Sequence, residues 1–503
     1  MLRCYSLKFP ASHHNNSAHD FCVLCVHTAA DDEAVSISHP CTPNHVLVQV
    51  SFTNNIPLLP GCGVVSGDTF DGAYSSAPSL TLQGLSGIKA GSAISTTTSS
   101  DSVLNGLTPA YANGNLEITP SNALSAGSYS FQFDVRNQES ANDPSASALS
   151  LQASYVTMSG GTATAVSTPV DDTRPFKIVA PYIDASSRVY QSSDEPCADN
   201  TISVSLTTNV PLYLECSPKI TLTGLTSSSS DTTVTELDLI FDSVSRSVTM
   251  ESWTRTTGIL VIVPGVDVDS SSNQFQVIFT LINPSHHQNA PGMDVDISYS
   301  GSSAWSTFAL FTIFNGVTGI AGSSNSEEYY PMKIREAVIS ASIIQSSPFP
   351  CDQNTITVSM SADVTLRSRC NPTITLSGLD GSETGDGDIS VTLSDGSTSS
   401  TQTESWASGA LTIADTTGLG DLQAGTQHSL SFVITNPNAA RASASTSLVV
   451  SLQDDFHSAS THAVSSMGLY AASALAGATW NARMGTSCTP QVIQSQYAHD
   501  LSC

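Results

Sequence analysis

The sequence predicts an all-β protein of three tandem β-sandwich domains, with an extended N-terminal arm and a C-terminal tail. Cysteine pairs recur at spacings of 21, 19 and 19 residues, and a similar strand-like sequence lies between the two cysteines of each pair. Apolar residues alternate with period two along much of the chain, and hardly any window has helical periodicity. The 503 residues also suit about three domains. The pairs are Cys41 with Cys62, Cys197 with Cys216, and Cys351 with Cys370.

The text around the cysteines predicts the first core strands of each module. An asparagine stands three residues after each first cysteine, and an alternating apolar strand follows. This pattern predicts one strand face on a core and the other in water. Modules two and three continue after the second cysteine with Pro-x-Ile-Thr-Leu-x-Gly-Leu. Module one carries about fourteen extra residues between Cys62 and Pro78, which predict a surface loop.

Later landmarks predict the rest of each sandwich. Trp253 and Trp406 each precede a glycine turn, and we expect them to pack in the core with the indole N–H bonded to one partner. Asn-Pro at 283–284 and 436–437 ends a further strand, because proline cannot donate to the ladder. About seven short strands per module indicate an immunoglobulin-like sandwich. The predicted domains are residues 1–40 (arm), 41–182, 183–338, 339–452 and 453–503 (tail completing the third domain or contacting a neighbour).

The recurring cysteines predict a disulfide framework, and therefore an oxidising, extracellular or cell-surface location. We expect the bonds to form within modules, as Cys41 with Cys62, Cys197 with Cys216, and Cys351 with Cys370. Each would tie the start of the first strand to the loop after it, which closes about 20 residues for about 3 kcal/mol. This spacing is too short for the long-range bond of antibody domains.

The repeated strand motifs resemble those of very large secreted proteins of algae and other protists. The motifs are Asn-Thr-Ile-Thr/Ser-Val-Ser, Cys-x-Pro-x-Ile-Thr-Leu-Ser/Thr-Gly-Leu, a tryptophan before a glycine turn, and a strand ending in Asn-Pro. The resemblance covers modules two and three well, module one moderately, and neither end. It implies tandem immunoglobulin-like domains of cell-surface or flagellar-hair (mastigoneme-like) glycoproteins, and it supplies no catalytic residues.

Five cysteines lie outside the modules, and we assign them to terminal disulfides or to bonds between subunits. Because five is odd, at least one is free, reduced or bonded to another chain. Cys22-Val-Leu-Cys25 has the spacing of a redox or zinc motif, but no second CxxC or histidine stands at a recognised distance. The five are Cys4, Cys22, Cys25, Cys488 and Cys503.

The N-terminal arm contains a strand-like run from Ala34 to Ser38. We expect it to dock on a sheet edge, either of a neighbouring subunit by strand addition or of module one in its own chain. Contacts of the first kind do not close on themselves, and they would propagate into a filament.

Charge and composition exclude several partners. The chain carries 16 Lys and Arg against 43 Asp and Glu, a formal net charge of −27, so we expect no binding to nucleic acid. We expect no membrane insertion, because no run of 18 apolar residues occurs. Serine and threonine make up roughly a quarter of the residues and charged residues only 12%, a balance typical of secreted β-proteins.

Few residue patterns indicate chemistry. Asp386 and Asp388 lie in a glycine-rich acidic loop that is a candidate Ca²⁺ site, but the matching loop of module two has almost no acids, so we expect no metal or cofactor. No Gly-x-Ser-x-Gly elbow occurs, and we expect no enzyme. Asn15 is a candidate N-glycan acceptor in Asn-Asn-Ser, and the serine clusters are candidates for O-linked sugar.

These observations predict a structural subunit that polymerises with itself into an extracellular filament or surface appendage, through its terminal arms and disulfides. The alternative is an adhesin or carbohydrate-binding surface protein that acts through exposed loops such as Gly63 to Ser79. A hydrolase on a β scaffold is a third and weaker alternative.

Overall fold

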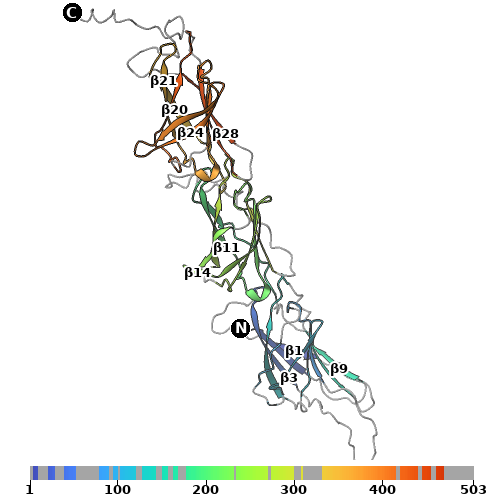
Figure 1. The fold of residues 1–503 in the computed structure, drawn as a ribbon. Helices are drawn as coiled ribbons and strands as arrows, with labels where there is room; N and C mark the ends of the chain where they lie inside the picture. The colour runs from blue at the N-terminus through green and yellow to red at the C-terminus, as the bar shows by residue number, and fades with distance from the viewer. Residues whose placement is uncertain are drawn as a thin grey trace, which may run out of the picture.

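The protein is an elongated all-β rod in the computed structural model (Figure 1). The regular elements of the described residues are β-strands and two short 3₁₀ turns, which confirms the predicted class. Three groups of strands follow one another along the rod in chain order (Figure 1). The structure describes residues 4–8, 21–28, 39–52 and 79–468, the last range with gaps at 90–93, 100–101, 103, 121–126, 143–149, 157–161, 168–176, 232–233, 270–272, 300–307, 310–330, 415–419, 440–444 and 455–459.

Module two consists of two antiparallel sheets. One has the order β10-β11-β17-β13-β14 and the other β15-β16-β12-β18-β19. The first contains β10 (Arg188–Gln191), β11 (Asp199–Thr207), β17 (Gln274–Ile282), β13 (Thr235–Phe241) and β14 (Val244–Arg246). The second contains β15 (Val248–Thr254), β16 (Ile259–Pro264), β12 (Lys219–Thr223), β18 (Asp294–Ser298) and β19 (Phe308–Ala309).

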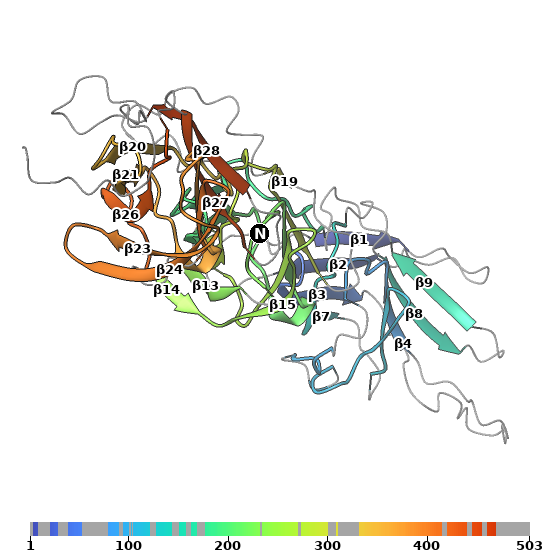
Figure 2. The ribbon, with the colours of Figure 1, turned by 45° about the horizontal axis from the view of Figure 1, so that its top comes forward.

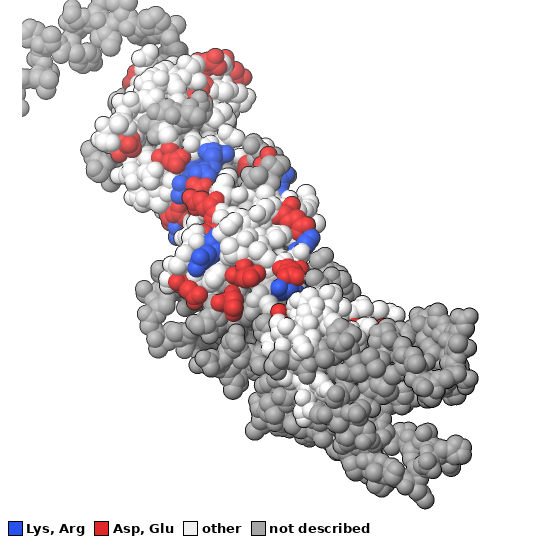
Figure 3. Space-filling view, turned by 90° about the horizontal axis from the view of Figure 1, so that it is seen from below, with Lys and Arg blue, Asp and Glu red and all other residues white. Residues whose placement is uncertain are grey.

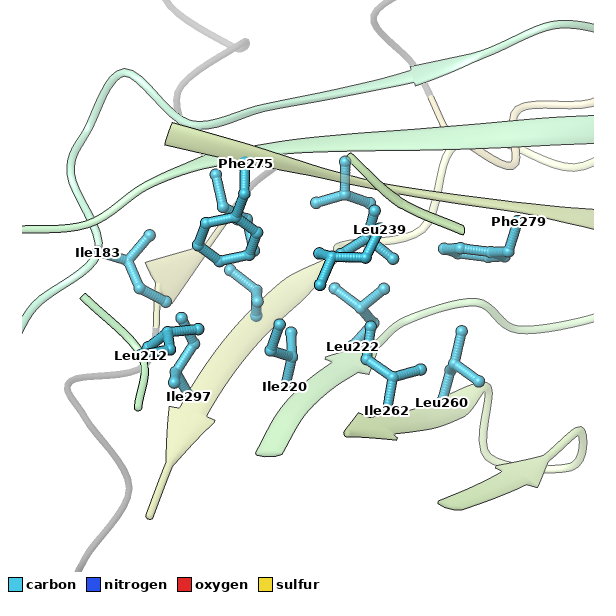
Figure 4. Packing of buried hydrophobic residues seen from close by; sticks show 14 of the residues in the cluster. Ile183, Leu212, Ile220, Leu222, Leu239, Leu260, Ile262, Phe275, Phe279 and Ile297 are labelled. Atoms are coloured by element: carbon cyan, nitrogen blue, oxygen red, sulfur yellow. The ribbon is translucent and has the colours of Figure 1, made fainter. Parts of the chain in front are cut away.

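A single apolar core joins these two sheets. Ile202, Val204 and Leu206 of β11 are buried and alternate with half-buried polar residues, as the sequence pattern predicts. Figure 4 shows Leu239 and Phe275 on one side of this core, and Ile220 and Leu222 on the other. The two sheets are therefore the layers of one module, held together mainly by burial of apolar surface.

Module three repeats this arrangement as one continuous nine-stranded sheet. Its order is β20-β21-β26-β23-β24-β25-β22-β27-β28, and the long β23–β24 hairpin joins the two halves. Trp406 and Phe432 lie in its core with ring centroids 6.1 Å apart. The strands are β20 (Ile339–Gln345), β21 (Gln353–Ala362), β22 (Thr373–Ser377), β23 (Gly387–Ser394), β24 (Ser399–Ala407), β25 (Ala410–Ile413), β26 (His428–Thr435), β27 (Ser445–Leu452) and β28 (Ser460–Gly468).

Module one has the sheets β1-β2-β3-β7 and β5-β6-β4-β8-β9, seen best in Figure 2. Its β2 lies beside β3 as β10 and β20 lie beside β11 and β21, and β1 continues the sheet beyond β2. The strands are β1 (Cys4–Lys8), β2 (Phe21–Thr28), β3 (Pro43–Phe52), β4 (Ser79–Gln83), β5 (Ala110–Ala112), β6 (Asn115–Ile118), β7 (Gly127–Arg136), β8 (Ser150–Val156) and β9 (Thr162–Ser167).

Both chain ends contribute strands to their own modules. β2 pairs with β3, and β1 pairs with β2, so residues of the predicted arm belong to the sheet of module one. β1 and β2 thus dock within the chain, whereas the predicted run from Ala34 to Ser38 lies outside the described residues. At the other end β28 pairs with β27, so Ser460–Gly468 of the predicted tail extend the sheet of module three.

Candidate functional site

The junctions between modules carry the most specific side-chain chemistry of the described residues. Two disulfides cross them, Cys41 with Cys216 and Cys197 with Cys370, each with a Cα–Cα distance of 6.1 Å. Cys351 is also disulfide-bonded. The first cysteine of one module therefore bonds to the second cysteine of the next.

The predicted bonds within modules are wrong. Cys41 does not pair with Cys62, and Cys370 is taken by Cys197 and not by Cys351. In module two, Cys197 and Cys216 lie on either side of β11, whose nine residues span about 30 Å. Because disulfide Cα atoms lie within about 7 Å of each other, two cysteines separated by a full strand cannot bond. Each instead meets a cysteine at the facing end of the neighbouring module.

Paired buried asparagines hold the first cysteine of each module in place. Asn200 Nδ2 donates to Asn283 Oδ1 at 2.9 Å, and Asn283 Nδ2 donates to the carbonyls of Ser193 and Glu195. Both asparagines are fully buried. The amide of Cys197 donates to the carbonyl of Pro284 at 3.1 Å, so the loop before the cysteine is fixed to the strand end beside it.

The same arrangement occurs at the other two first cysteines. Asn354 donates to Asn436 at 2.8 Å, and Asn44 donates to Asn137 at 3.2 Å. Cys41, Cys197 and Cys351 all have left-handed backbones, with φ of 63°, 59° and 62°. This conformation is costly for residues other than glycine, and the asparagine pairs offset that cost by satisfying the loop carbonyls. The sequence showed the recurring asparagines, but not that they bond to each other.

The second cysteine ends a short 3₁₀ turn in modules two and three. The turns are Leu214–Cys216 and Ser368–Cys370, each followed by a residue with a left-handed backbone. An aspartate of the same module fixes each turn, since the Leu214 amide donates to Asp267 and the Ser368 amide donates to Asp421. Cys216 and Cys370 are buried at 1% exposure. Both halves of each disulfide are thus held by contacts within their own module.

At the junction of modules one and two, basic residues of module one meet Glu215. Arg136 forms an ion pair with the Glu215 carboxylate and donates to the Cys41 carbonyl at 2.7 Å. Lys89 Nζ donates to the Glu215 carbonyl at 2.7 Å and lies 3.1 Å from the Glu139 carboxylate. Burial at this junction lowers the pKa of His39, although Asp269 opposes the shift.

At the junction of modules two and three, the charges are reversed. Arg369 of module three binds both carboxylate oxygens of Asp199, at 2.7 and 2.8 Å. This hydrogen bonding lowers the pKa of Asp199 against the smaller effect of its desolvation. Glu195 lies 3.0 Å from Arg335 and 3.5 Å from Arg367. In Figure 3, basic residues on the described surface lie next to acidic ones, and most of that surface is neither.

A buried carboxylate adds a second contact between modules two and three. Asp454, which follows β27 of module three, is 5% exposed. Its Oδ2 accepts hydrogen bonds from the Ser229 hydroxyl and the Ser285 amide of module two, both at 2.9 Å. Since the backbone of Gln453 also donates to the Cys370 carbonyl, the end of β27 is tied to the disulfide.

The predicted tryptophan roles are confirmed in both modules. Trp406 is 1% exposed, and its indole N–H donates to the Thr384 carbonyl at 3.3 Å. Trp253 is half-buried against the core of module two and donates to the Ser230 carbonyl at 3.4 Å. Gly409 explains the turn after Trp406, because its φ is +79° and a Cβ there would lie 2.6 Å from the Asp380 amide nitrogen.

The other predicted site residues lie away from these junctions or outside the described residues. Asp386 accepts a hydrogen bond from the Ser408 amide, and no metal-type group of three acidic, histidine or cysteine residues occurs within the described ranges. In the part of the chain that the structure describes, no helix is long and apolar enough to cross a membrane.

Cys4 stands opposite Cys25 in the β1–β2 register. Asn15, Cys62, Cys488, Cys503 and nearly all of the loop from Gly63 to Ser79 lie outside the described residues, and Cys22 lies in β2.

No known protein family matches the sequence, and no curated protein does, so the algal resemblance stays a prediction. Among solved structures, a putative membrane anchored protein from Corynebacterium diphtheriae is 11% identical, with 97% of this chain and 100% of that chain covered and a TM-score of 0.19. The N-terminal domain of the Streptococcus gordonii adhesin Sgo0707 is 12% identical over 61% of this chain and 82% of that chain, with a TM-score of 0.19. A structure of manganese lipoxygenase of Gaeumannomyces graminis with part of a zonadhesin of Komagataella pastoris is 10% identical over 57% and 91%, with a TM-score of 0.16. Scores this low carry no argument about fold or function.

Proposed function

We propose that this protein is a structural subunit of an extracellular filament or surface appendage, in which it serves as a stiff, covalently stapled rod. The observation that carries the proposal is the repetition of one junction, with the first cysteine of a module bonded to the second cysteine of the next. Both bonds point the same way along the chain, so the modules stack head to tail.

The junctions contain what a stiff rod requires. A flexible string of domains would have open linkers and small, wet interfaces. Here each junction has a disulfide together with ion pairs, and the second also has the buried Asp454 contact. A load along the rod therefore acts on covalent bonds between adjacent ends, and not only on the connecting backbone.

The strand order supports an immunoglobulin-like class for the modules. In module two, β10, β11, β17 and β13 take the order of strands A, B, E and D, and β12, β18 and β19 take that of C, F and G. The hairpin β15–β16 is an addition beside strand C. Such domains recur in cell-surface proteins, and disulfides persist outside the cytosol, so both features favour an extracellular location.

The route of assembly that we propose differs from strand donation by the N-terminal arm, because the arm strands β1 and β2 already pair within the sheet of their own module. We infer that copies associate through the ends of the rod, where the junction surfaces of the modules lie. Head-to-tail contacts of this kind do not close on themselves, and they extend into a filament.

Negative-stain images and small-angle scattering of the purified, oxidised chain test this function. A rod of constant length that forms end-to-end fibres at high concentration is the expected result. Bent or variable particles would remove the stiff-rod proposal, and straight rods that stay monomeric at every concentration would remove the filament role. Reduction with a thiol should make the particles bend at both junctions.

A further inference from the structure

The Cys41–Cys216 disulfide of the first junction has a cation at one of its sulfurs. Lys89 Nζ donates to Cys216 Sγ at 3.4 Å and to the Glu215 carbonyl at 2.7 Å. Lys89 belongs to module one and Cys216 to module two, so both contacts cross the junction. The Glu139 carboxylate, 3.1 Å from Nζ, holds the lysine in this place. An ammonium group that contacts a cysteine sulfur stabilises the thiolate that forms when a disulfide opens.

The disulfide of the second junction has no such cation. Within the described residues, no lysine or arginine donates to the sulfur of Cys197 or of Cys370. The arginine next to Cys370 is Arg369, and it binds both carboxylate oxygens of Asp199. The two disulfides therefore differ in how strongly their surroundings stabilise negative charge on sulfur.

Lys89 occupies the position in module one that Ser229 occupies in module two. The Lys89 amide donates to the Arg136 carbonyl at 2.9 Å. The Ser229 amide donates to the Ile282 carbonyl at the same distance. Arg136 and Ile282 are equivalent, because each stands opposite the residue two positions after its first cysteine. At the second junction this position binds Asp454, whereas at the first it places a cation at the disulfide.

The second junction also opens less readily than the first. All four cysteines of the two bonds are at most 1% exposed, so a thiol from solution reaches either bond only when the junction opens. Opening the second junction must separate Asp454 from the Ser229 hydroxyl and from the buried Ser285 amide. Access and the stability of the leaving thiolate thus both favour reduction of the first bond.

We propose that the first junction is a redox-sensitive hinge, in which a small-molecule thiol such as glutathione reduces Cys41–Cys216 while the disulfide of the second junction stays oxidised. The thiolate of the reductant attacks Cys41 Sγ, the disulfide breaks, and Cys216 leaves as a thiolate beside Lys89. A second reductant thiolate attacks the reductant sulfur of the mixed disulfide, so Cys41 leaves and the reductant is oxidised to its disulfide. Both cysteine thiolates take up protons from water.

Titration of the oxidised, folded full chain with dithiothreitol tests the hinge. Free thiols are trapped with N-ethylmaleimide, and the alkylated fractions of Cys216 and Cys370 are measured by fragmentation mass spectrometry. We expect Cys216 to be trapped at a dithiothreitol concentration about tenfold lower than Cys370. Equal midpoints, or earlier trapping of Cys370, would overturn the proposal.

Lys89→Met distinguishes the sulfur contact from a purely structural role of the lysine. If Lys89 only held the modules together, its loss would open the junction and speed reduction of Cys216. Because Lys89 stabilises the leaving thiolate, we expect reduction to slow by about threefold or more, where the rate is proportional to dithiothreitol. An unchanged or higher rate would overturn the proposal.

Two further variants serve as controls. Lys89→Arg keeps the charge and should retain most of the rate. Lys219→Met removes a lysine that pairs with Glu251 on the surface of module two, and it should leave the rate unchanged. In each variant, an unchanged reduction rate of Cys370 shows that modules two and three remain folded.

Small-angle scattering then tests the consequence for shape. At a dithiothreitol concentration that reduces only the first bond, the rod should bend once, between module one and the other two modules. A profile identical to that of the oxidised rod would overturn the hinge. All of these measurements are made on single chains, so a filament that fails to form leaves them unchanged and the two proposals fail separately.

Discussion

The two junctions share a covalent framework and differ in their charges. At both, a first cysteine with a left-handed backbone bonds to a second cysteine with the same Cα–Cα distance of 6.1 Å. At the first junction the basic residues lie on the preceding module, and the acidic residue Glu215 lies on the following one. At the second junction the acids Glu195 and Asp199 lie on the preceding module and the arginines on the following one.

This difference separates what the repeat requires from what each interface requires. Glu215 and Arg369 are equivalent residues, since each stands just before the second cysteine, yet their charges are opposite. A bond between module one and module three would place Arg369 near Arg136, and like charges in that position repel. The disulfides make the junctions strong, and the charges favour the correct order of modules.

Removing the disulfides should have the largest effect, and it should be unequal at the two junctions. We expect Cys197→Ser with Cys370→Ser to cost about 2–5 kcal/mol in the free energy of unfolding. The matched pair Cys41→Ser with Cys216→Ser should bend the rod more, because no contact equivalent to Asp454 supports the first junction within the described residues. Denaturant unfolding and small-angle scattering measure the two effects. Equal bending in both variants would contradict the comparison.

The asparagine pairs should come next. Asn200→Ala leaves the amides of Ser192 and Ser193 without their acceptor and removes the partner of Asn283, so we expect a loss of about 3 kcal/mol in stability. Asn44→Ala should cost only about 1 kcal/mol, because Asn44 Oδ1 has no hydrogen-bond partner among the residues that the structure describes. Chemical denaturation of both variants measures the difference, and equal losses would show that the module-one network is as important as that of module two.

Asp454→Ala tests the buried contact that the second junction has in addition to its disulfide and ion pairs. The change leaves the Ser229 hydroxyl and the buried Ser285 amide without this acceptor, and we expect a loss of about 1–3 kcal/mol. Asp388→Ala, at an exposed position of the same module, is the control and should change stability by less than about 0.5 kcal/mol. If both variants unfold at the same denaturant concentration, Asp454 does not stabilise the junction.

The smallest effect should be a difference in pH dependence. Burial lowers the pKa of His39 in the folded chain. The contribution of neutral His39 to the free energy of unfolding is therefore complete above about pH 6.5, and it is lost as the pH falls below that value towards the folded pKa. The pKa of Asp199 is also lowered, so its contribution is complete above about pH 3.8 and is lost as the pH falls through the folded value. Between pH 7 and 5 the first junction should therefore weaken before the second.

Thermal unfolding of His39→Gln and Asp199→Asn across this range separates the two groups. In the His39 variant, the unfolding temperature should no longer change between pH 7 and 5. In the Asp199 variant, the fall in unfolding temperature over this range should remain. The magnitude at Asp199 should stay below about 1 kcal/mol, since this ion pair is partly exposed to solvent. A slope that persists without His39 would assign the dependence to another group.

The sequence by itself determined the all-β class and the positions of the alternating core strands, because these follow from local alternation and turn chemistry. The alternating residues of β11 and the two tryptophans lie as that pattern predicts. Sequence also located the recurring cysteines and asparagines. Local pattern could not pair them, because a bond depends on which ends of neighbouring modules meet.

Only the tertiary structure decided the pairing. A strand that separates Cys197 from Cys216 by about 30 Å places each at an opposite end of module two, where it faces a different neighbour. The same stacking brought Asp454 against Ser229, 225 residues apart, and set Arg369 opposite Asp199. Such contacts depend on how whole modules pack against each other. The spacing of residues within one module therefore does not predict them.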